Sequence, residues 1–339
     1  MRYSALLGTV LVLGAAAAMA DRGAQAQTAD PNSAPNPYHI DNGWAPQLPA
    51  GRKLGAAIGI SVDRDGKSIW VYERCGGDTC EGSNLDPIFK LAPDGKVLAN
   101  FGGGKVNWPH GFTVDRDDNV WVTDGRGGNG KGHDVIKFSP DGKVLLTLGK
   151  PGTAGLADDE FNTPSDVHVG PNGDIFVADG HGLINKVVTN DRIVKLTKDG
   201  KFIKAWSKHG SAAAELDTPH KLAIDSQNRL FVADRVNNRV QIFDLDGRLL
   251  TEWKQFGRPS SVWIDKNDVL YVTDSQSDEK TNPGFKQGIR IGSAKDGKVT
   301  AFIPEQFEGW RPEGIGVDDA GNVYGGFVEK KAVRKFVKQ

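Results

Sequence analysis

The sequence predicts an all-β protein, a six-bladed β-propeller with four antiparallel strands in each blade. The first observation is a repeat, in which a short strand, a polar turn and a second strand recur along the chain. Its six copies, aligned at one equivalent position, fall at Ile58, His110, Ser165, His220, Ser260 and Glu313, with spacings of 52, 55, 55, 40 and 53 residues. Repeats of this length that hold several short strands are typical of propellers and solenoids.

The second observation is a hairpin signal in the later part of each repeat. Asp-Gly pairs lie between alternating apolar runs at 94–95, 141–142, 199–200 and 246–247. Asp-Gly in this setting is the strongest short-range indication of a β-hairpin. These turns predict a third and a fourth strand in each unit, and four antiparallel strands make one propeller blade.

Within each unit the elements follow one scheme. The first strand alternates apolar residues, as in Phe112 and Val114, and a turn of Asp, Asn and Gly follows it. The second strand is aromatic and β-branched, as in residues 120–123 (Val-Trp-Val-Thr).

The last repeat is incomplete. Residues 332–338 match a third strand, and the chain then ends at Gln339. Since soluble proteins avoid open strand edges, we expect the segment from Tyr38 to Trp44 to supply the missing outer strand and close the sixth blade. The sequence requires no helix of note.

The chain divides into three parts. Residues 1–26 are predicted to be a cleaved signal peptide, with Arg2 before an apolar run and small residues for cleavage after Ala20 or Ala26. Residues 27–37 are expected to be a flexible lead-in, and residues 38–339 a single propeller domain. We therefore expect a secreted or periplasmic protein without a membrane span after cleavage. A net charge of −1 without a basic run argues against a nucleic-acid partner.

The two cysteines, Cys75 and Cys80, lie in one loop. In an oxidising compartment they are expected to form a local disulfide. A reactive thiol pair or a metal clip is the alternative, although no nearby residues complete a four-ligand set.

A metal site is predicted at one rim of the central channel, which the first strands line. His110, His220 and Glu313 occupy the same repeat position in alternate blades, so their side chains are expected to converge. Two imidazoles and one carboxylate with open coordination positions suit catalytic Zn²⁺ or another divalent metal. A histidine at the start of a strand is otherwise commonly a packing or hydrogen-bonding residue.

Several residues after the second strands are candidates for binding and proton transfer. Arg74 and Arg235 would clamp a substrate carboxylate or phosphate, unless they merely pair with a neighbouring acid. His181, between two glycines, is a candidate proton acceptor or a simple loop residue. Arg126, Trp108 and Trp310 are candidates for the substrate-binding wall, and core packing explains the two tryptophans equally well.

The residues from Val232 to Phe243 resemble an NHL repeat. The Pro-His-Gly at 109–111, the Pro-His at 219–220 and the Ala-Asp-Arg at 233–235 resemble peptidyl-α-hydroxyglycine α-amidating lyase, a likeness that runs from about Tyr38 to the end. That family holds a catalytic zinc with three histidines, uses two arginines, and has a tyrosine beside the metal. His110 and His220 match two of the ligands, and Arg74 and Arg235 match the arginines.

The sequence departs from the family at three positions. Glu313 stands at the third ligand position, His181 at that of the tyrosine, and Gly314 where the family has an acidic ligand for a structural calcium. The resemblance implies a lyase that cleaves a carbinolamide C–N bond to an amide and glyoxylate, acting on a small molecule or peptide that carries a carboxylate. A metal-dependent hydrolase of the lactonase type and a non-catalytic scaffold for protein or glycan binding are the alternatives.

Overall fold

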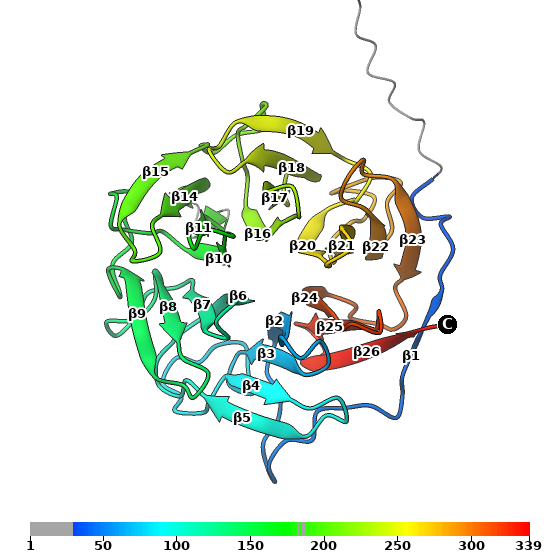
Figure 1. Cartoon of the computed structure of the whole chain (residues 1–339), viewed down its shortest axis with the longest axis horizontal. Helices are drawn as coiled ribbons and strands as arrows, with labels where there is room; N and C mark the ends of the chain where they lie inside the picture. Colours follow the sequence, from blue (N-terminus) through cyan, green and yellow to red (C-terminus); the bar gives the residue numbers. More distant parts are fainter. Residues whose placement is uncertain (1–29, 182, 185–186) are drawn as a thin grey trace, which may run out of the picture.

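The chain forms a closed ring of six four-stranded antiparallel sheets around a central channel, as seen in the computed structural model (Figure 1). The structure describes residues 30–181, 183–184 and 187–339. The proposed signal peptide at 1–26 lies outside the described residues. Both the all-β fold and the count of six blades predicted from the repeats are confirmed.

The first three blades follow the repeats in order. Blade one consists of β2 (Ala57–Val62), β3 (Ile69–Glu73), β4 (Ile88–Leu91) and β5 (Val97–Phe101). Blade two consists of β6 (Pro109–Val114), β7 (Val120–Asp124), β8 (Asp134–Phe138) and β9 (Val144–Gly149). Blade three consists of β10 (Pro164–Val169), β11 (Ile175–Asp179), β14 (Arg192–Leu196) and β15 (Phe202–Trp206).

The other three blades complete the ring. Blade four consists of β16 (Pro219–Ile224), β17 (Arg229–Asp234), β18 (Arg239–Asp244) and β19 (Leu249–Trp253). Blade five consists of β20 (Pro259–Ile264), β21 (Val269–Asp274), β22 (Gly288–Ser293) and β23 (Val299–Pro304). Blade six consists of β24 (Pro312–Val317), β25 (Val323–Phe327), β26 (Ala332–Lys338) and β1 (Tyr38–Ile40).

The N-terminal strand closes the last blade, as the truncated sixth repeat predicts. β1 pairs antiparallel with β26, with Tyr38 opposite Lys338 and Ile40 opposite Phe336. The lead-in before it is tied to blade five in its described part, where Asn32 accepts a hydrogen bond from Arg290 (2.7 Å) and Pro35 accepts one from the amide of Phe302 (3.0 Å).

Burial falls from the channel outward, which explains the strand compositions. The second strand β7 is buried at every position, whereas the outer strand β9 is largely exposed. The Asp-Gly turns join third to fourth strands as predicted, and their glycines have a positive φ (for example 87° at Gly95) that other residues rarely adopt. Apolar side chains of neighbouring blades form the core between the sheets.

One element goes beyond the four-strand scheme. A small hairpin of β12 (Leu183–Ile184) and β13 (Val187–Val188) is inserted between β11 and β14 of blade three. Because it lies outside the repeat, the repeat pattern gave no sign of it. His181 lies two residues before its first strand.

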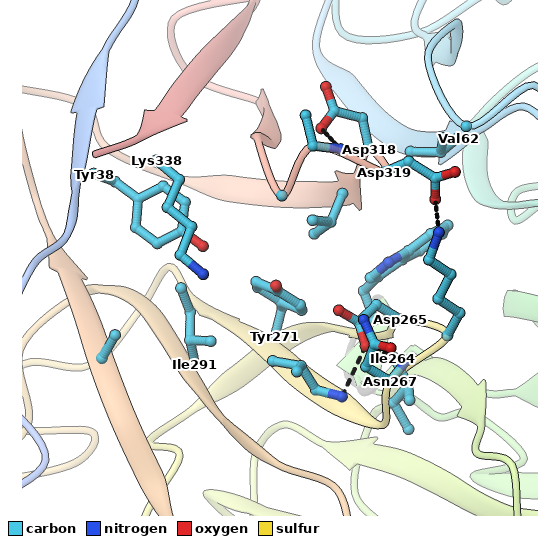
Figure 2. Close-up of a pocket in the computed structure, with 18 of the residues that line it drawn as sticks. Tyr38, Val62, Ile264, Asp265, Asn267, Tyr271, Ile291, Asp318, Asp319 and Lys338 are labelled. Atoms are coloured by element: carbon cyan, nitrogen blue, oxygen red, sulfur yellow. Dashed lines mark hydrogen bonds and ion pairs between the residues drawn. The ribbon is translucent and has the colours of Figure 1, made fainter.

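A pocket of about 780 Å³ opens among blades five, six and one (Figure 2). Its lining includes Asp265, Asp318 and Asp319, which follow the first strands β20 and β24, and Tyr38 and Tyr271 from β1 and β21. It therefore lies at the opposite end of the first strands from the channel rim where the metal site is predicted. Within the described chain, no helix is both long enough and apolar enough to span a bilayer.

Candidate active site

A β-bulge marks the equivalent repeat position in every blade. In blade two the β6–β7 register shifts between Pro109 and Phe112, and in blade four the β16–β17 register shifts between Pro219 and Leu222. Corresponding shifts occur in the other four blades. A bulge bends its strand and redirects a side chain. The bulges thus set the direction in which His110 and His220 leave their strands.

Three histidines meet at one point. The rings of His110 and His220 have centroids 4.6 Å apart, so these two side chains from alternate blades do approach each other, as predicted. The ring of His181 lies 4.5 Å from that of His110 and 5.1 Å from that of His220. One nitrogen of each ring lies within 4.8 Å of the others. Among the described residues, this group of donor atoms contains His181 and does not contain Glu313.

Backbone carbonyls of the next blade orient two of the rings. Nδ1 of His110 lies 2.6 Å from the carbonyl oxygen of Ser165, and Nδ1 of His220 lies 2.6 Å from that of Ser260. A carbonyl accepts only, so each Nδ1 carries the proton and donates it. Nε2 of each ring is therefore left with a lone pair, the arrangement that protein metal ligands adopt.

The state of these nitrogens fits a metal. Nε2 of His110 is buried and has no hydrogen-bond partner in the structure, which is costly unless a ligand satisfies it. Nε2 of His220 accepts a hydrogen bond from Arg235 (2.7 Å), so this nitrogen is also unprotonated and its lone pair faces the cluster. Three neutral imidazoles suit Zn²⁺ with one open position.

The electrostatic surroundings keep the cluster neutral. Burial, and then the charge of neighbouring histidine and basic side chains, holds the pKa of His110 well below its ordinary value. The pKa values of His181 and His220 are lowered well below normal by burial first and by Arg235 next. All three rings are therefore unprotonated at neutral pH.

Both predicted arginines line the cluster. Arg235 donates to His220 and approaches Nε2 of His181 at 3.4 Å. Burial lowers the pKa of Arg235 to about 10, and the pKa of Arg74 to about 10, with Glu313 opposing the shift in both. Both guanidinium groups remain charged at neutral pH and suit an anionic ligand.

Glu313 reaches the same region from blade six. One of its carboxylate oxygens lies 3.6 Å from Nη1 of Arg235, and its side chain is 13% exposed. It is therefore a partner of Arg235 at the edge of the histidine cluster. Arg74 is anchored differently, by a hydrogen bond from its Nε to the carbonyl of Pro109 (3.1 Å).

Trp108 forms a wall beside the histidines. Its ring centroid lies 4.9 Å from that of His110 and 5.2 Å from that of His181. The guanidinium groups of Arg74 and Arg126 stack on the same indole, at 4.2 and 3.9 Å. Trp310, by contrast, is 1% exposed and packs within the core of blade six, against Phe327 and other aromatic residues.

The loop that carries His181 is anchored at both of its described ends. The amide of His181 donates to the hydroxyl of Thr189 (2.9 Å), which in turn donates to Asp191 (3.3 Å). Asp191 also lies 2.7 Å from Nδ1 of His209. Asp191, His209 and Asp217 form a second group of donor atoms within 4.8 Å of one another. We read this group as the anchor of the His181 loop.

Two features of the site were not found from the sequence. One is the pair of carbonyls, Ser165 and Ser260, that orient the histidines. The other is a buried ion pair beneath them, in which Lys221 lies 3.3 Å from Asp166 and donates to the carbonyl of His110 (3.2 Å). The sequence does carry one signal for this ion pair. The residue after the repeat position is charged in two neighbouring blades, Asp166 in blade three and Lys221 in blade four.

The predicted disulfide between Cys75 and Cys80 is present. It closes the loop that directly follows Arg74. The loop also touches blade two, because the amide of Cys80 donates to the carbonyl of Asn107 (2.7 Å). The disulfide therefore stabilises the loop next to the Arg74–Trp108 wall.

The fold and the site together define a six-bladed propeller with a histidine cluster at its axis. The NHL repeat model matches residues 216–243. The chain is 32% identical to human NHL repeat-containing protein 3 over 64% of its length and 59% of that protein. It is 34% identical to peptidyl-α-hydroxyglycine α-amidating lyase 1 of Drosophila melanogaster over 61% of its length and 40% of that protein.

A third relative matches over a longer part of this chain. The chain is 34% identical to peptidyl-glycine α-amidating monooxygenase B of Xenopus laevis over 84% of its length, but spans only 34% of that protein. Among solved structures, a gluconolactonase of Xanthomonas campestris superposes with a TM-score of 0.60 at 14% identity, covering 90% of this chain and 98% of that one. This likeness shows the fold alone. The sequence resemblance to NHL repeats and amidating lyases is thus confirmed.

Proposed function

We propose that this protein is a metal-dependent lyase of the amidating type, which cleaves the C–N bond of a carbinolamide that carries a carboxylate. The convergence of His110, His181 and His220 beside two buried arginines is the observation that carries the proposal. Sequence similarity to proteins named as peptidyl-α-hydroxyglycine α-amidating lyases supports the reaction class.

The ligand set of the proposal differs from the expectation of the sequence. We assign the three metal positions to His110, His181 and His220, because their donor nitrogens cluster and Nε2 of His110 lacks a partner. Glu313 becomes the counter-charge of Arg235. Arg235 and a metal ion would compete for the lone pair of His220, and Glu313 gives the displaced guanidinium an acceptor.

The residues present support the chemistry in named roles. Zinc at the cluster would supply a Lewis acid that lowers the pKa of the substrate hydroxyl. Arg74 and Arg235 bind the substrate carboxylate and align the scissile bond. Trp108 covers one side of the site.

The proton transfer falls to Glu313. Since the donor nitrogen of His181 faces the cluster, we assign the role of base to the Glu313 carboxylate rather than to His181. Glu313 accepts the hydroxyl proton while the C–O bond becomes the carbonyl of glyoxylate. The C–N electron pair passes to nitrogen, which takes this proton back from Glu313 and leaves as the amide.

The decisive experiment measures metal content and product together. Purified protein is expected to hold one equivalent of a divalent metal and to release glyoxylate and amide from a peptidyl-α-hydroxyglycine. The His110→Ala variant is expected to lose both, whereas His39→Ala, at an exposed histidine, keeps both. Lactone turnover without glyoxylate would establish the hydrolase instead, and activity that persists without metal would overturn the proposal.

We also propose that the protein is secreted or periplasmic after removal of residues 1–20 or 1–26. The disulfide is compatible with an oxidising compartment. N-terminal sequencing of the exported protein tests this, and an uncleaved N-terminus would contradict it.

A further inference from the structure

Blades three and four each contain a buried ion pair between their second and third strands. The carboxylate that ends β11, Asp179, lies 2.9 Å from Arg192, its pairing partner on β14. The carboxylate that ends β17, Asp234, lies 2.7 Å from Arg239, its pairing partner on β18. In both blades an arginine neutralises an acid that is completely buried.

The same arginine also fills a nest of backbone carbonyls from the loop before the blade. Arg192 donates to the carbonyls of Ala157 (3.2 Å) and Glu160 (2.9 Å). Arg239 donates to those of Ala212 (2.9 Å) and Glu215 (3.0 Å). Each guanidinium is therefore held by the carboxylate that ends the second strand and by two carbonyls of a short turn. Arg192 also donates to the carbonyl of Leu156 (2.8 Å), and Arg239 to the carboxylate of Glu252 (2.9 Å).

Blade two keeps this nest and replaces the arginine by an acid. Its turn has the same hydrogen bond, from the amide of Lys105 to the carbonyl of Gly102 (3.2 Å), as the turns at Ala157 (3.2 Å) and Ala212 (3.1 Å). Asp124 ends β7 as its counterparts end β11 and β17. The residue opposite it on β8 is Asp134. Two carboxylates thus face each other where the sister blades have an acid and a base.

Within the described part of the chain neither carboxylate forms an ion pair, and the charge of Lys131 acts on Asp124 only from beyond ion-pair distance. Asp124 is fully buried and Asp134 is 2% exposed. The described ion pairs of the chain include neither residue, and Oδ1 of Asp134 has no hydrogen-bond partner. Asp124 accepts hydrogen bonds from the amides of Asn107 (2.7 Å) and Trp108 (2.6 Å), which support it as an anion. A buried charge of this kind requires compensation.

We propose that a calcium ion occupies the position that the guanidinium takes in the sister blades, held by Asp124, Asp134 and the carbonyls of Gly102 and Lys105. The donors are all hard oxygens, which Ca²⁺ prefers, whereas the axial cluster offers only nitrogen. The site lies in blade two, away from Gly314, the position at which the family resemblance places a calcium ligand. Its backbone connection to Trp108 links it to the wall of the candidate active site.

Thermal unfolding of the whole protein with calcium chloride or with EGTA tests the proposal. The wild type is expected to gain about 3–5 °C in Tm at calcium concentrations near 100 times Kd. Asp134→Asn is expected to lose this response. Asp134→Arg, which rebuilds the pairing of blades three and four, is expected to be insensitive to calcium.

Two further measurements separate this site from the histidine cluster. Titration by calorimetry is expected to show one calcium per chain in the wild type and in His110→Ala, and none in Asp134→Asn. A wild type without a calcium response, or an Asp134→Asn variant that keeps it, would overturn the proposal. Stability that depends on pH but not on calcium would show that the two carboxylates share a proton instead.

Discussion

At the scale of single residues, the site depends on which nitrogen of each histidine is protonated. The carbonyls of Ser165 and Ser260 each accept a hydrogen bond from an Nδ1–H, so both Nε2 atoms are left with a free electron pair. The residues at the repeat position in blades three and five therefore orient the histidines of blades two and four. Ser165 and Ser260 therefore contribute to the site through their backbone carbonyls.

The ligand assignment predicts opposite results for two variants. His181→Ala is expected to weaken metal binding by more than about 100-fold, since even the outer partners of metal ligands contribute 10–100-fold. Glu313→Gln is expected to retain the metal and lose turnover. Elemental analysis after dialysis distinguishes the two, and metal loss from Glu313→Gln alone would restore Glu313 as a ligand.

Asp134 predicts a pH dependence of stability in the absence of calcium. Burial, and then the charge of Asp124, raises the pKa of Asp134 to about 8. A carboxyl whose pKa is higher in the folded than in the unfolded state destabilises the fold when it ionises, so stability falls as pH rises from about 4 to 8. From pH 5 to pH 8 the wild type in EGTA is expected to lose roughly 1–3 kcal/mol through this group. Urea unfolding of Asp134→Asn should show a flatter profile, and an identical profile would contradict the assignment.

At the scale of strands, a buried network connects the first strands of blades two, three and four beneath the histidines. Asp166 accepts hydrogen bonds from the amides of Phe112 (3.2 Å) and Leu222 (2.8 Å) as well as its contact with Lys221. Lys221 reaches the carbonyl of His110. The spacing of β6, β10 and β16 is therefore set by polar contacts as well as by packing.

Removing only one charge of the Lys221–Asp166 pair is expected to lower the unfolding free energy more than removing both charges. Lys221→Met leaves the buried Asp166 carboxylate without its cation and is expected to cost about 3–5 kcal/mol of unfolding free energy. The double variant Lys221→Met with Asp166→Asn is expected to recover at least half of the loss. Denaturant unfolding of the two variants and the wild type measures this coupling. Equal losses in the single and double variants would show that the ion pair is not the cause.

At the scale of the whole molecule, the ring is closed by the pairing of β1 with β26. Tyr38 is 5% exposed and its strand covers an edge that would otherwise lie open. Deleting residues 1–40 is expected to lower the unfolding free energy by at least about 2 kcal/mol, the burial of one large side chain, and to promote association through the free edge. The control lacks only residues 1–29. Calorimetry and size-exclusion chromatography compare the two, and equal stability would show that β1 is dispensable.

The repeat register predicted the ring and much of its site for a physical reason. Equivalent positions in a propeller are related by rotation about one axis, so the place of Pro109 and Pro219 in the repeat predicts that His110 and His220 approach each other. His181 lies in an insertion outside this register, and no repeat pattern could bring it to the axis. Trp310 stands two residues before Pro312, whereas Trp108 stands directly before Pro109, and its ring packs in the core of blade six.

Because the ring is closed by the pairing of β1 with β26, its blades and its closure form in a fixed order. Tyr38 is among the earliest residues of the domain to be synthesised, and its partner Lys338 follows 300 residues later. The first strand must wait, unpaired, until β26 has been made, and closing so long a loop carries an entropic cost. Synthesis of the sixth blade, rather than of any earlier one, therefore sets the earliest moment at which the ring can close.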